Sequence, residues 1–279
     1  MDFGMPTLIE LDSLSDTVSL CKTLGLRFVE LNMNLPWYQP DKLSADMLSP
    51  FLDGTVYFTI HLDENLDPWH FNPLISKACT DTALAAIRVA RETGIPILNM
   101  HMNHGVYFKL PGQQVYLYSR FRDEYMRKTR EFRDACEQAI RNSDIKICVE
   151  NCGGFTDFEM EALDLLLQSP AFALTLDIGH SHAAGGRDEP FILQNLGRLT
   201  HMHVHDAIGE KNHLPLGSGE IDIAARLALA QAHNYRCVLE VKTVEGLKGS
   251  VSWIKERHGG YMGIFANECG TKAEMPYTN

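Results

Sequence analysis

Short runs rich in β-branched and other apolar residues recur along this chain, and longer amphipathic stretches separate them. Eight runs have the length and composition of strands, namely residues 4–10, 28–33, 57–62, 95–101, 146–151, 172–178, 199–205 and 236–241. Strands that alternate with helices run parallel, because each helix returns the chain to the start of the next strand. Eight repeats of this unit predict an α/β fold that closes on itself, a (β/α)₈ TIM barrel.

The segments between these runs carry the periodicity and the start and stop signals of helices. The predicted helices cover residues 12–24, 73–93, 117–141, 158–167, 189–196, 222–233 and 244–258. Asp12 or Ser13 can cap the first helix, and Gly25 ends it. Segment 42–52 is too short for a firm helix prediction, and residues 102–116 form the longest irregular insertion.

The length of the chain indicates a single domain. Its 279 residues match the roughly 250 residues of one such barrel, and a hydrophobic content of 45% is enough for a large core. A doubly wound open sheet is disfavoured, because no glycine-rich dinucleotide turn follows the first strand. We expect the barrel over residues 1–258 and a C-terminal extension over 259–279, either part of the same domain or a flexible tail.

The composition also indicates the cellular compartment and the kinds of partner that the protein can bind. The first residues lack a signal-peptide pattern, and no segment approaches the roughly 20 apolar residues of a membrane span, so we expect a cytoplasmic protein. Seven cysteines without a CxxC pair indicate reduced thiols. A formal net charge of −11 disfavours non-specific binding to nucleic acid or anionic membrane. A homo-oligomer that pairs through an exposed helix face remains open.

Side chains of the metal-ligand type gather at the carboxyl ends of the predicted strands. They are Glu30, His61, His101, Glu150, Asp177, His180, His201, His203, His205, Asp206 and Glu240. Along a strand, alternate residues face opposite sides, and here the polar residues alternate with apolar neighbours such as Leu176 and Val204. The polar set therefore points to the barrel axis, at the end where such barrels place their active sites.

Several carboxylates that converge on one buried point require a cation. Three carboxylates repel one another, and burying them unpaired is costly. A divalent ion removes this conflict, and a donor set of carboxylate oxygens and one imidazole nitrogen suits Mn²⁺, Mg²⁺, Co²⁺ or Zn²⁺. The sequence therefore predicts a divalent metal cofactor.

Four motifs connect the chain to a known family. They are VEN at 149–151, DIGH at 177–180, HVHDA at 203–207 and HLPLGSGEID at 213–222. With these motifs the chain resembles the xylose-isomerase-like TIM barrels, which group sugar (phosphate) isomerases and epimerases with apurinic endonucleases of the endonuclease IV type. The resemblance runs from VELN at 29–32 to LEVK at 239–242.

The epimerase branch of this family implies one metal ion and two proton-transfer groups. The ligand positions of that branch fall on Glu150, Asp177, His203 and Glu240. Glu150 and Glu240 would also move protons on opposite faces of a ketose or related sugar, through an enediolate intermediate. His180 would contact a substrate oxygen.

The endonuclease branch implies up to three zinc ions and draws on further histidines. The matching positions are His61, His101, His180 and His213, which here either hold substrate or bind a second ion. The family's aspartate two residues before the last of these is Lys211, which indicates an incomplete third metal site. His213 has three open interpretations, as a substrate contact, a metal ligand or an organiser of its loop.

The residues around the expected barrel mouth help to weigh the functions. The loops at 32–41 and 63–72 carry no lysine or arginine, so they offer little to a nucleic acid, and an endonuclease IV-like phosphodiesterase is the less favoured alternative. A lyase or dehydratase that acts on a keto-sugar or keto-inositol stays open. A non-catalytic binding module is disfavoured, because both glutamates are present.

Weaker expectations concern substrate contacts. Trp37, Tyr38, Trp69 and Phe71 follow the second and third strands and could form apolar walls for a sugar. Glu30 could orient a neighbour or bind substrate, and Lys211 is a candidate cation at the rim. His201 lies one residue pair deeper than His203, and we expect it to be packed rather than a ligand. Cys152 is interpreted as a packing residue at a strand end.

Overall fold

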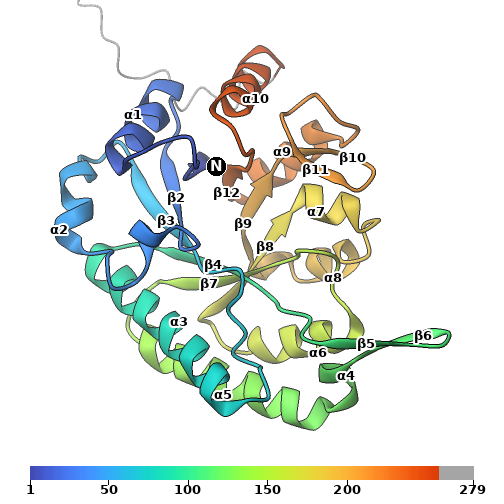
Figure 1. The fold of residues 1–279 in the computed structure, drawn as a ribbon. Helices are drawn as coiled ribbons and strands as arrows, with labels where there is room; N and C mark the ends of the chain where they lie inside the picture. The colour runs from blue at the N-terminus through green and yellow to red at the C-terminus, as the bar shows by residue number, and fades with distance from the viewer. Residues whose placement is uncertain (258–279) are drawn as a thin grey trace, which may run out of the picture.

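Eight parallel strands form a closed barrel in the computed structural model, which describes residues 1–257 (Figure 1). The barrel strands are β1 (Asp2–Pro6), β2 (Phe28–Asn32), β3 (Tyr57–His61), β4 (Ile97–His101), β7 (Lys146–Glu150), β8 (Phe172–Asp177), β9 (Leu199–Val204) and β12 (Arg236–Leu239). Their order around the barrel is β1-β12-β9-β8-β7-β4-β3-β2. The predicted (β/α)₈ barrel is confirmed, and the expected extension over 259–279 lies outside the described residues.

Helices surround the sheet, as Figure 1 shows, and cover its outer face. They are α1 (Leu14–Leu24), α2 (Ala45–Leu48), α3 (Pro73–Thr93), α4 (Leu117–Arg120), α5 (Arg122–Ile140), α6 (Asp157–Leu166), α7 (Ile178–Ala183), α8 (Glu189–Gln194), α9 (Ile223–His233) and α10 (Val244–Arg257). Single 3₁₀ turns occur at Pro36–Tyr38, Ser49–Phe51 and Leu196–Arg198.

Local signals in the sequence set several helix ends. The hydroxyl of Ser13, rather than Asp12, caps α1 by accepting a hydrogen bond from the amide of Asp16 at 3.1 Å. Gly25 and Gly94 end α1 and α3 with φ values of 75° and 74°, a left-handed conformation that glycine adopts without strain. At α6 the cap is Thr156, paired with Glu159 in a capping box.

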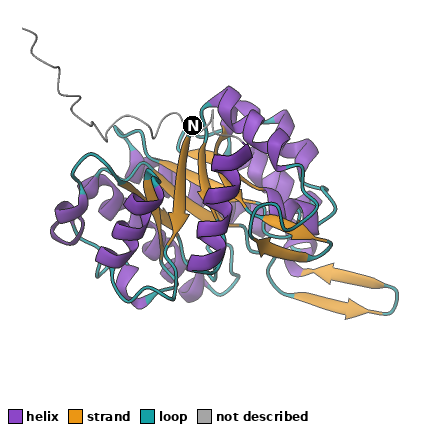
Figure 2. Ribbon diagram, turned by 90° about the horizontal axis from the view of Figure 1, so that it is seen from above, coloured by secondary structure: helices purple, strands orange, loops and turns teal. Residues whose placement is uncertain are grey.

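The structure differs from the sequence prediction mainly in the loops. The insertion at 102–116 contains a hairpin of β5 (Tyr107–Leu110) and β6 (Gln113–Tyr116), which projects from the body in Figure 2. A second hairpin, β10 (Asp206–Ile208) and β11 (Lys211–Leu214), follows β9. Strands of three or four residues are too short to show a clear periodicity in the sequence.

One predicted helix is divided in the structure, and the segment without a firm helix prediction forms only short turns. The segment at 117–141 divides at Phe121 into α4 and α5, and the doubtful segment at 42–52 forms the single turn of α2 and a 3₁₀ turn. The helix α7 directly after β8 was not predicted, because six residues are too few for a helical pattern to stand out.

Two expectations from composition can be compared with the described residues. Within 1–257, none of the helices is both long enough and apolar enough to cross a bilayer. The six cysteines of this part of the chain are free thiols, as expected, and Cys269 lies beyond it.

Candidate metal centre

Four side chains from neighbouring strands converge at the carboxyl end of the barrel. They are Glu150 at the end of β7, Asp177 at the end of β8, His203 in β9 and Glu240 directly after β12. One ligand atom from each lies within 4.8 Å of the ligand atoms of the other three. The parallel register explains part of this convergence, because it places Asp177 beside His203.

His203 lies at the centre of this group. Its Nδ1 atom is 3.1 Å from Oε2 of Glu240, 3.3 Å from Oε2 of Glu150 and 3.8 Å from Oδ2 of Asp177. The side chains of Asp177 and His203 are fully buried and that of Glu150 is 1% exposed, whereas that of Glu240 is 12% exposed. The site therefore opens to solvent on the side of Glu240.

The donor atoms fit a divalent cation. Both ring nitrogens of His203 and Oε2 of Glu240 are buried and make no well-aligned hydrogen bond in the described structure. Nε2 lies 2.8 Å from Glu30, whereas Nδ1 and Glu240 Oε2 face each other at 3.1 Å. Buried polar atoms are rarely left in this state, so Nδ1 and Oε2 are available to an ion. Three carboxylates and one imidazole form the set that Mn²⁺, Mg²⁺, Co²⁺ or Zn²⁺ accepts.

Attraction between the His203 imidazole and the surrounding carboxylates is a main feature of the electrostatics of the cluster. Burial is the largest single influence and opposes the ionisation of Glu150 and Glu240. Together, His203 with His101 beside Glu150, and His203 with Lys242 beside Glu240, outweigh it and hold the pKa of both carboxyls well below their usual range. Burial likewise opposes protonation of His203, yet the surrounding carboxylates raise its pKa well above the ordinary value. A cation at the centre is thus strongly favoured, and a metal ion would replace the ring proton in that role.

Asp177 also begins the helix α7. Its Oδ1 atom accepts a hydrogen bond from the amide of His180 at 2.6 Å, and so caps the helix. This turn brings His180 back to the centre, where its Nδ1 atom lies 3.5 Å from Oε1 of Glu150. The DIGH motif therefore provides both a ligand and a second histidine at the site.

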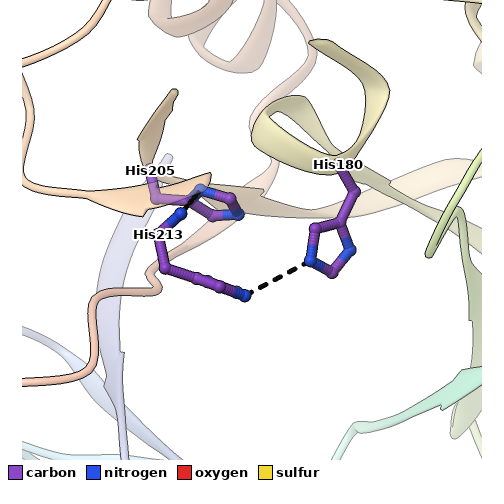
Figure 3. Close-up of side chains that lie close together, drawn as sticks. All are labelled: His180, His205 and His213. Atoms are coloured by element: carbon purple, nitrogen blue, oxygen red, sulfur yellow. Dashed lines mark hydrogen bonds between the residues drawn. The ribbon is translucent and has the colours of Figure 1, made fainter. Parts of the chain in front are cut away.

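Three histidines form a wall beside the centre, drawn in Figure 3. The amide of His213 donates to Nδ1 of His205 at 2.8 Å, and the Nε2 atoms of His180 and His213 are 3.3 Å apart. His205 Nε2 in turn contacts Oδ2 of Asp177 at 3.0 Å. Because both ring nitrogens of His205 already have partners, His205 acts as a support between His213 and Asp177.

His61 and His101 approach Glu150 from the opposite side. Their Nε2 atoms lie 3.5 and 3.6 Å from its Oε2 atom. The Nδ1 atom of His61 donates to the carbonyl of Leu62 at 2.8 Å, so its Nε2 atom is the one that faces Glu150. Burial opposes protonation of this ring, but the Glu150 carboxylate raises the pKa of His61 to about 9. All four histidines that matched the endonuclease branch therefore lie around the cluster.

Asp206 organises the loop that carries His213. Its Oδ2 atom accepts hydrogen bonds from the amides of Gly217 and Gly219 at 3.0 and 2.8 Å, and its Oδ1 atom accepts from Ala207 and Ile221 at 3.0 and 3.2 Å. A Cβ atom on Gly219 would lie 2.3 Å from Asp206 Oδ1, so this position requires glycine. Loop organisation, one of the roles considered for His213, thus rests on Asp206.

A comparison with protein families decides where this chain belongs. A family model described as xylose isomerase-like TIM barrel matches residues 18–257. The chain belongs to the xylose isomerase-like TIM barrel family. The proposed resemblance is therefore confirmed at the level of the family.

Solved structures agree with this family membership. A D-tagatose 3-epimerase-like protein is 21% identical, with a TM-score of 0.72 over 95% of this chain and 98% of that one. The apo form of 3-keto-D-glucoside 4-epimerase from E. coli is 13% identical, with a TM-score of 0.72 over 92% and 99%. The IOLI protein with a zinc atom is 16% identical, with a TM-score of 0.67 over 97% and 100%. At these identities the likeness shows the shared fold. No curated protein sequence matches the chain.

Some expected substrate contacts of this family member are corrected by burial. Trp69 is fully buried, with ring centroids 6.1 Å from Tyr125 and 5.9 Å from Phe132, so it packs against α5 and has no face for a sugar. Glu30 is 1% exposed and its Oε1 atom lies 2.8 Å from Nε2 of His203, so it lies beside a neighbouring side chain and not at an open surface.

The other expected substrate contacts differ in how exposed their side chains are. Tyr38 is also buried, whereas Trp37 is 58% exposed beside it. Phe71 packs edge-on against the rings of Tyr118 and Phe121. Lys211 is exposed at the start of β11, opposite Ile208 in the hairpin. Of the expected aromatic walls, Trp37 is therefore the one with a large accessible face.

Several buried polar residues of the site were not singled out in the sequence. The amide of Asn99 donates to Glu150, and Thr175 donates to Asn99 at 2.6 Å. Asn151 holds the backbone of Asp177 through bonds of 2.8 and 2.9 Å to its amide and carbonyl. Strand alternation places Thr175 on the same side as Asp177, inside the barrel, and it could have placed Asn99, two residues before His101, there as well.

Proposed function

We propose that the protein is a divalent-metal-dependent isomerase or epimerase that acts on a ketose or related sugar. The observation that carries this proposal is the buried group of Glu150, Asp177, His203 and Glu240 around one point, in which His203 Nδ1 and Glu240 Oε2 make no well-aligned hydrogen bond. The printed names of two similar structures, a tagatose 3-epimerase-like protein and a ketoglucoside 4-epimerase, support the choice of substrate class.

The four ligands would hold one ion, and the zinc atom named with the similar IOLI structure supports a bound metal. Bound there, a divalent ion supplies Lewis-acid charge that favours an enediolate form of the substrate. The other parts of the reaction fall to the side chains of this chain.

Glu150 and Glu240 are the proposed proton-transfer groups. One carboxylate accepts the proton of a carbon next to the sugar carbonyl, and the electron pair of the C–H bond enters the enediolate. The other glutamate delivers a proton taken up from solvent to the opposite face of that carbon, which inverts it, and the first carboxyl group then releases its proton to solvent. Their surroundings differ, because Lys242 Nζ lies 3.1 Å from Oε1 of Glu240, whereas Asn99 donates to Glu150.

The surrounding histidines are proposed to bind substrate oxygens. His61, His101, His180 and His213 present ring nitrogens around the cluster on two sides. Neutral imidazoles can donate to or accept from sugar hydroxyls, which suits a polyol better than an apolar ligand. The exposed face of Trp37 could lie against the sugar carbons.

Proton exchange with solvent tests the proposal directly. Protein loaded with Mn²⁺ is incubated with a panel of ketoses in D₂O, and deuterium at the carbon next to the carbonyl is measured by NMR. We expect exchange with at least one ketose, and a decrease of about 10²–10⁴-fold in Glu150→Gln and Glu240→Gln. The control is Glu131→Gln, whose side chain is 61% exposed and pairs with Arg127.

The outcomes separate the candidate activities. Exchange with recovery of an epimer supports the proposal, whereas exchange followed by loss of water identifies a dehydratase, the activity named for one similar structure. Absence of exchange with every ketose, together with cleavage of abasic-site DNA, would overturn the proposal in favour of the phosphodiesterase.

A further inference from the structure

A layer of polar side chains lies inside the barrel directly beneath the proposed metal ligands. Its five members are buried, with at most 1% exposure, and are Glu30, Thr59, Asn99, Thr175 and His201. Thr175 and His201 stand two residues before the ligands Asp177 and His203 on the same strands. Barrel interiors are usually filled by branched apolar residues, and buried polar groups are costly. A polar layer at this depth therefore indicates a role that apolar packing cannot fill.

The layer contacts two of the four proposed ligands. Asn99 Nδ2 donates a hydrogen bond to Oε2 of Glu150. Glu30 Oε1 lies 2.8 Å from Nε2 of His203, and Thr59 Oγ1 donates to the other oxygen of Glu30 at 3.2 Å. Each of the two ligands thus has a polar partner in this layer.

Thr175 and His201 extend the layer behind Asn99. The hydroxyl of Thr175 donates to Asn99 Oδ1 at 2.6 Å, because an amide oxygen can only accept. The hydroxyl proton is then used, so at 3.2 Å Thr175 accepts from Nδ1 of His201. With its proton on Nδ1, the His201 ring offers only an acceptor at Nε2, which makes no hydrogen bond to Oε2 of Glu30, 3.4 Å away. The layer therefore has two parts, one behind Glu150 and one behind His203.

We propose that these five residues form a positioning layer that orients Glu150 and His203 for metal binding. In this layer Glu30 keeps the proton of His203 on Nε2, so that Nδ1 is the atom that binds the metal. Partners behind metal ligands typically change metal affinity by about 10–100-fold when they are removed. The inference rests on the metal centre proposed above and is independent of the sugar reaction.

Thr175 offers the cleanest test, because valine has nearly the same shape and lacks only the hydroxyl. The dissociation constant for Mn²⁺ is measured by EPR of the unbound ion in wild type, Thr175→Val and Thr175→Ser. We expect Thr175→Val to raise Kd about tenfold or more and Thr175→Ser, which keeps the hydroxyl, to restore it. The matched control is Thr129→Val in α5, another fully buried threonine, whose hydroxyl bonds to Tyr125 O.

Glu30→Gln provides a second, independent measurement. The expected increase in Kd is again about 10–100-fold. Its control is Glu159→Gln, since Glu159 is equally buried and lies 2.6 Å from Nδ1 of His104, outside the metal cluster. Histidine ring ¹⁵N spectra of the Zn²⁺-loaded wild type should show the His203 proton on Nε2.

The possible results are distinguishable. Wild type that binds no Mn²⁺ refutes the metal centre itself. Wild type that binds Mn²⁺, with unchanged Kd in both Thr175→Val and Glu30→Gln, refutes the positioning layer alone. Equal loss of affinity in the two control variants also refutes it, because the effect is then general destabilisation. A His203 proton on Nδ1 in the Zn²⁺-loaded protein contradicts the role of Glu30.

Discussion

The imidazole of His203 lies within 3.8 Å of four carboxylates, those of Glu30, Glu150, Asp177 and Glu240. The ring can carry one positive charge, and Lys242 Nζ lies 3.1 Å from Glu240, which leaves part of the surrounding negative charge uncompensated. A divalent ion adds the missing charge and at the same time uses the buried lone pairs. At the residue scale, this charge balance is the physical basis for the proposed metal.

A second buried glutamate shows how an ordinary pair differs from this cluster. Glu159 is fully buried, caps α6, and contacts the single histidine His104 in the loop after β4. The contact joins the base of the β5–β6 hairpin to α6. One carboxylate and one imidazole can balance each other, so this pair requires no metal.

The His104–Glu159 pair has a predictable dependence on pH. The hydrogen bond to Glu159 raises the pKa of His104, against the effect of partial burial. A raised folded-state pKa contributes stability below the unfolded pKa, and this contribution is lost as pH rises through the folded value. We therefore expect His104→Gln to lower the free energy of unfolding more at pH 6 than at pH 9, measured by urea denaturation. A difference that grows with pH would contradict this assignment.

At the scale of elements, the helix α7 and the strand β9 meet without space between them. An added Cβ on Gly179 would lie 1.9 Å from Cε1 of His205. The His205 ring cannot move aside easily, because it is held by Asp177 on one side and by the amide of His213 on the other. The glycine in the DIGH motif thus permits the close approach that brings His180 to the site.

Gly179→Ala is expected to disturb both stability and the site. Overpacking of this kind costs about 1–3 kcal/mol, and displacement of His205 should also weaken Mn²⁺ binding. Gly249→Ala in α10 is the matched control, because it also lies within a helix and has no atom within 4 Å of an added Cβ. The control should stabilise the protein by about 0.5–1 kcal/mol. Equal unfolding free energies of the two variants would count against the contact.

For the whole molecule, the metal centre joins strands that are distant in sequence. Its ligands come from β7, β8, β9 and the end of β12, a span from Glu150 to Glu240. Without an ion, the carboxylates at this point repel one another, which works against closure of this side of the barrel. Metal binding should therefore act on global stability as well as on activity.

The expected stabilisation follows from mass action. At a free Mn²⁺ concentration of a hundred times Kd, the free energy of unfolding should rise by about 2.7 kcal/mol, and a chelator should remove the increase. Glu240→Ala should lose most of the Mn²⁺ effect, whereas an exposed change such as Glu131→Gln should keep it. A melting temperature that does not respond to Mn²⁺ in the wild type would argue against a metal at this centre.

Much of the architecture and most of the centre were predictable from the chain. Strand parity and the position of polar residues at strand ends predicted that Glu150, Asp177 and His203 meet, since parallel strands bring their carboxyl ends to one edge. The same parity applies to Asn99 and Thr175. Their neutral side chains simply carry no obvious signal of chemistry, and so they were not singled out.

Whether a loop residue is buried or exposed depends on tertiary packing, which leaves no periodic pattern in the sequence. Trp69 and Trp37 stand in similar loops with similar neighbours, yet one is buried against α5 and the other is exposed. The loop around the β10–β11 hairpin is held by tertiary contacts, such as the four amides that converge on Asp206.

The sequence by itself determined the order of strands and helices, the closed parallel barrel and the edge at which the acidic and histidine side chains gather. These properties follow from local periodicity and from the alternation of side chains along a strand. The tertiary structure alone decided that Glu30 lies against His203, that Trp69 is buried against α5 and that Asp206 binds the amides of the loop that follows His213. Each of these depends on contacts between residues far apart in the chain, and their distances are set only when the barrel closes.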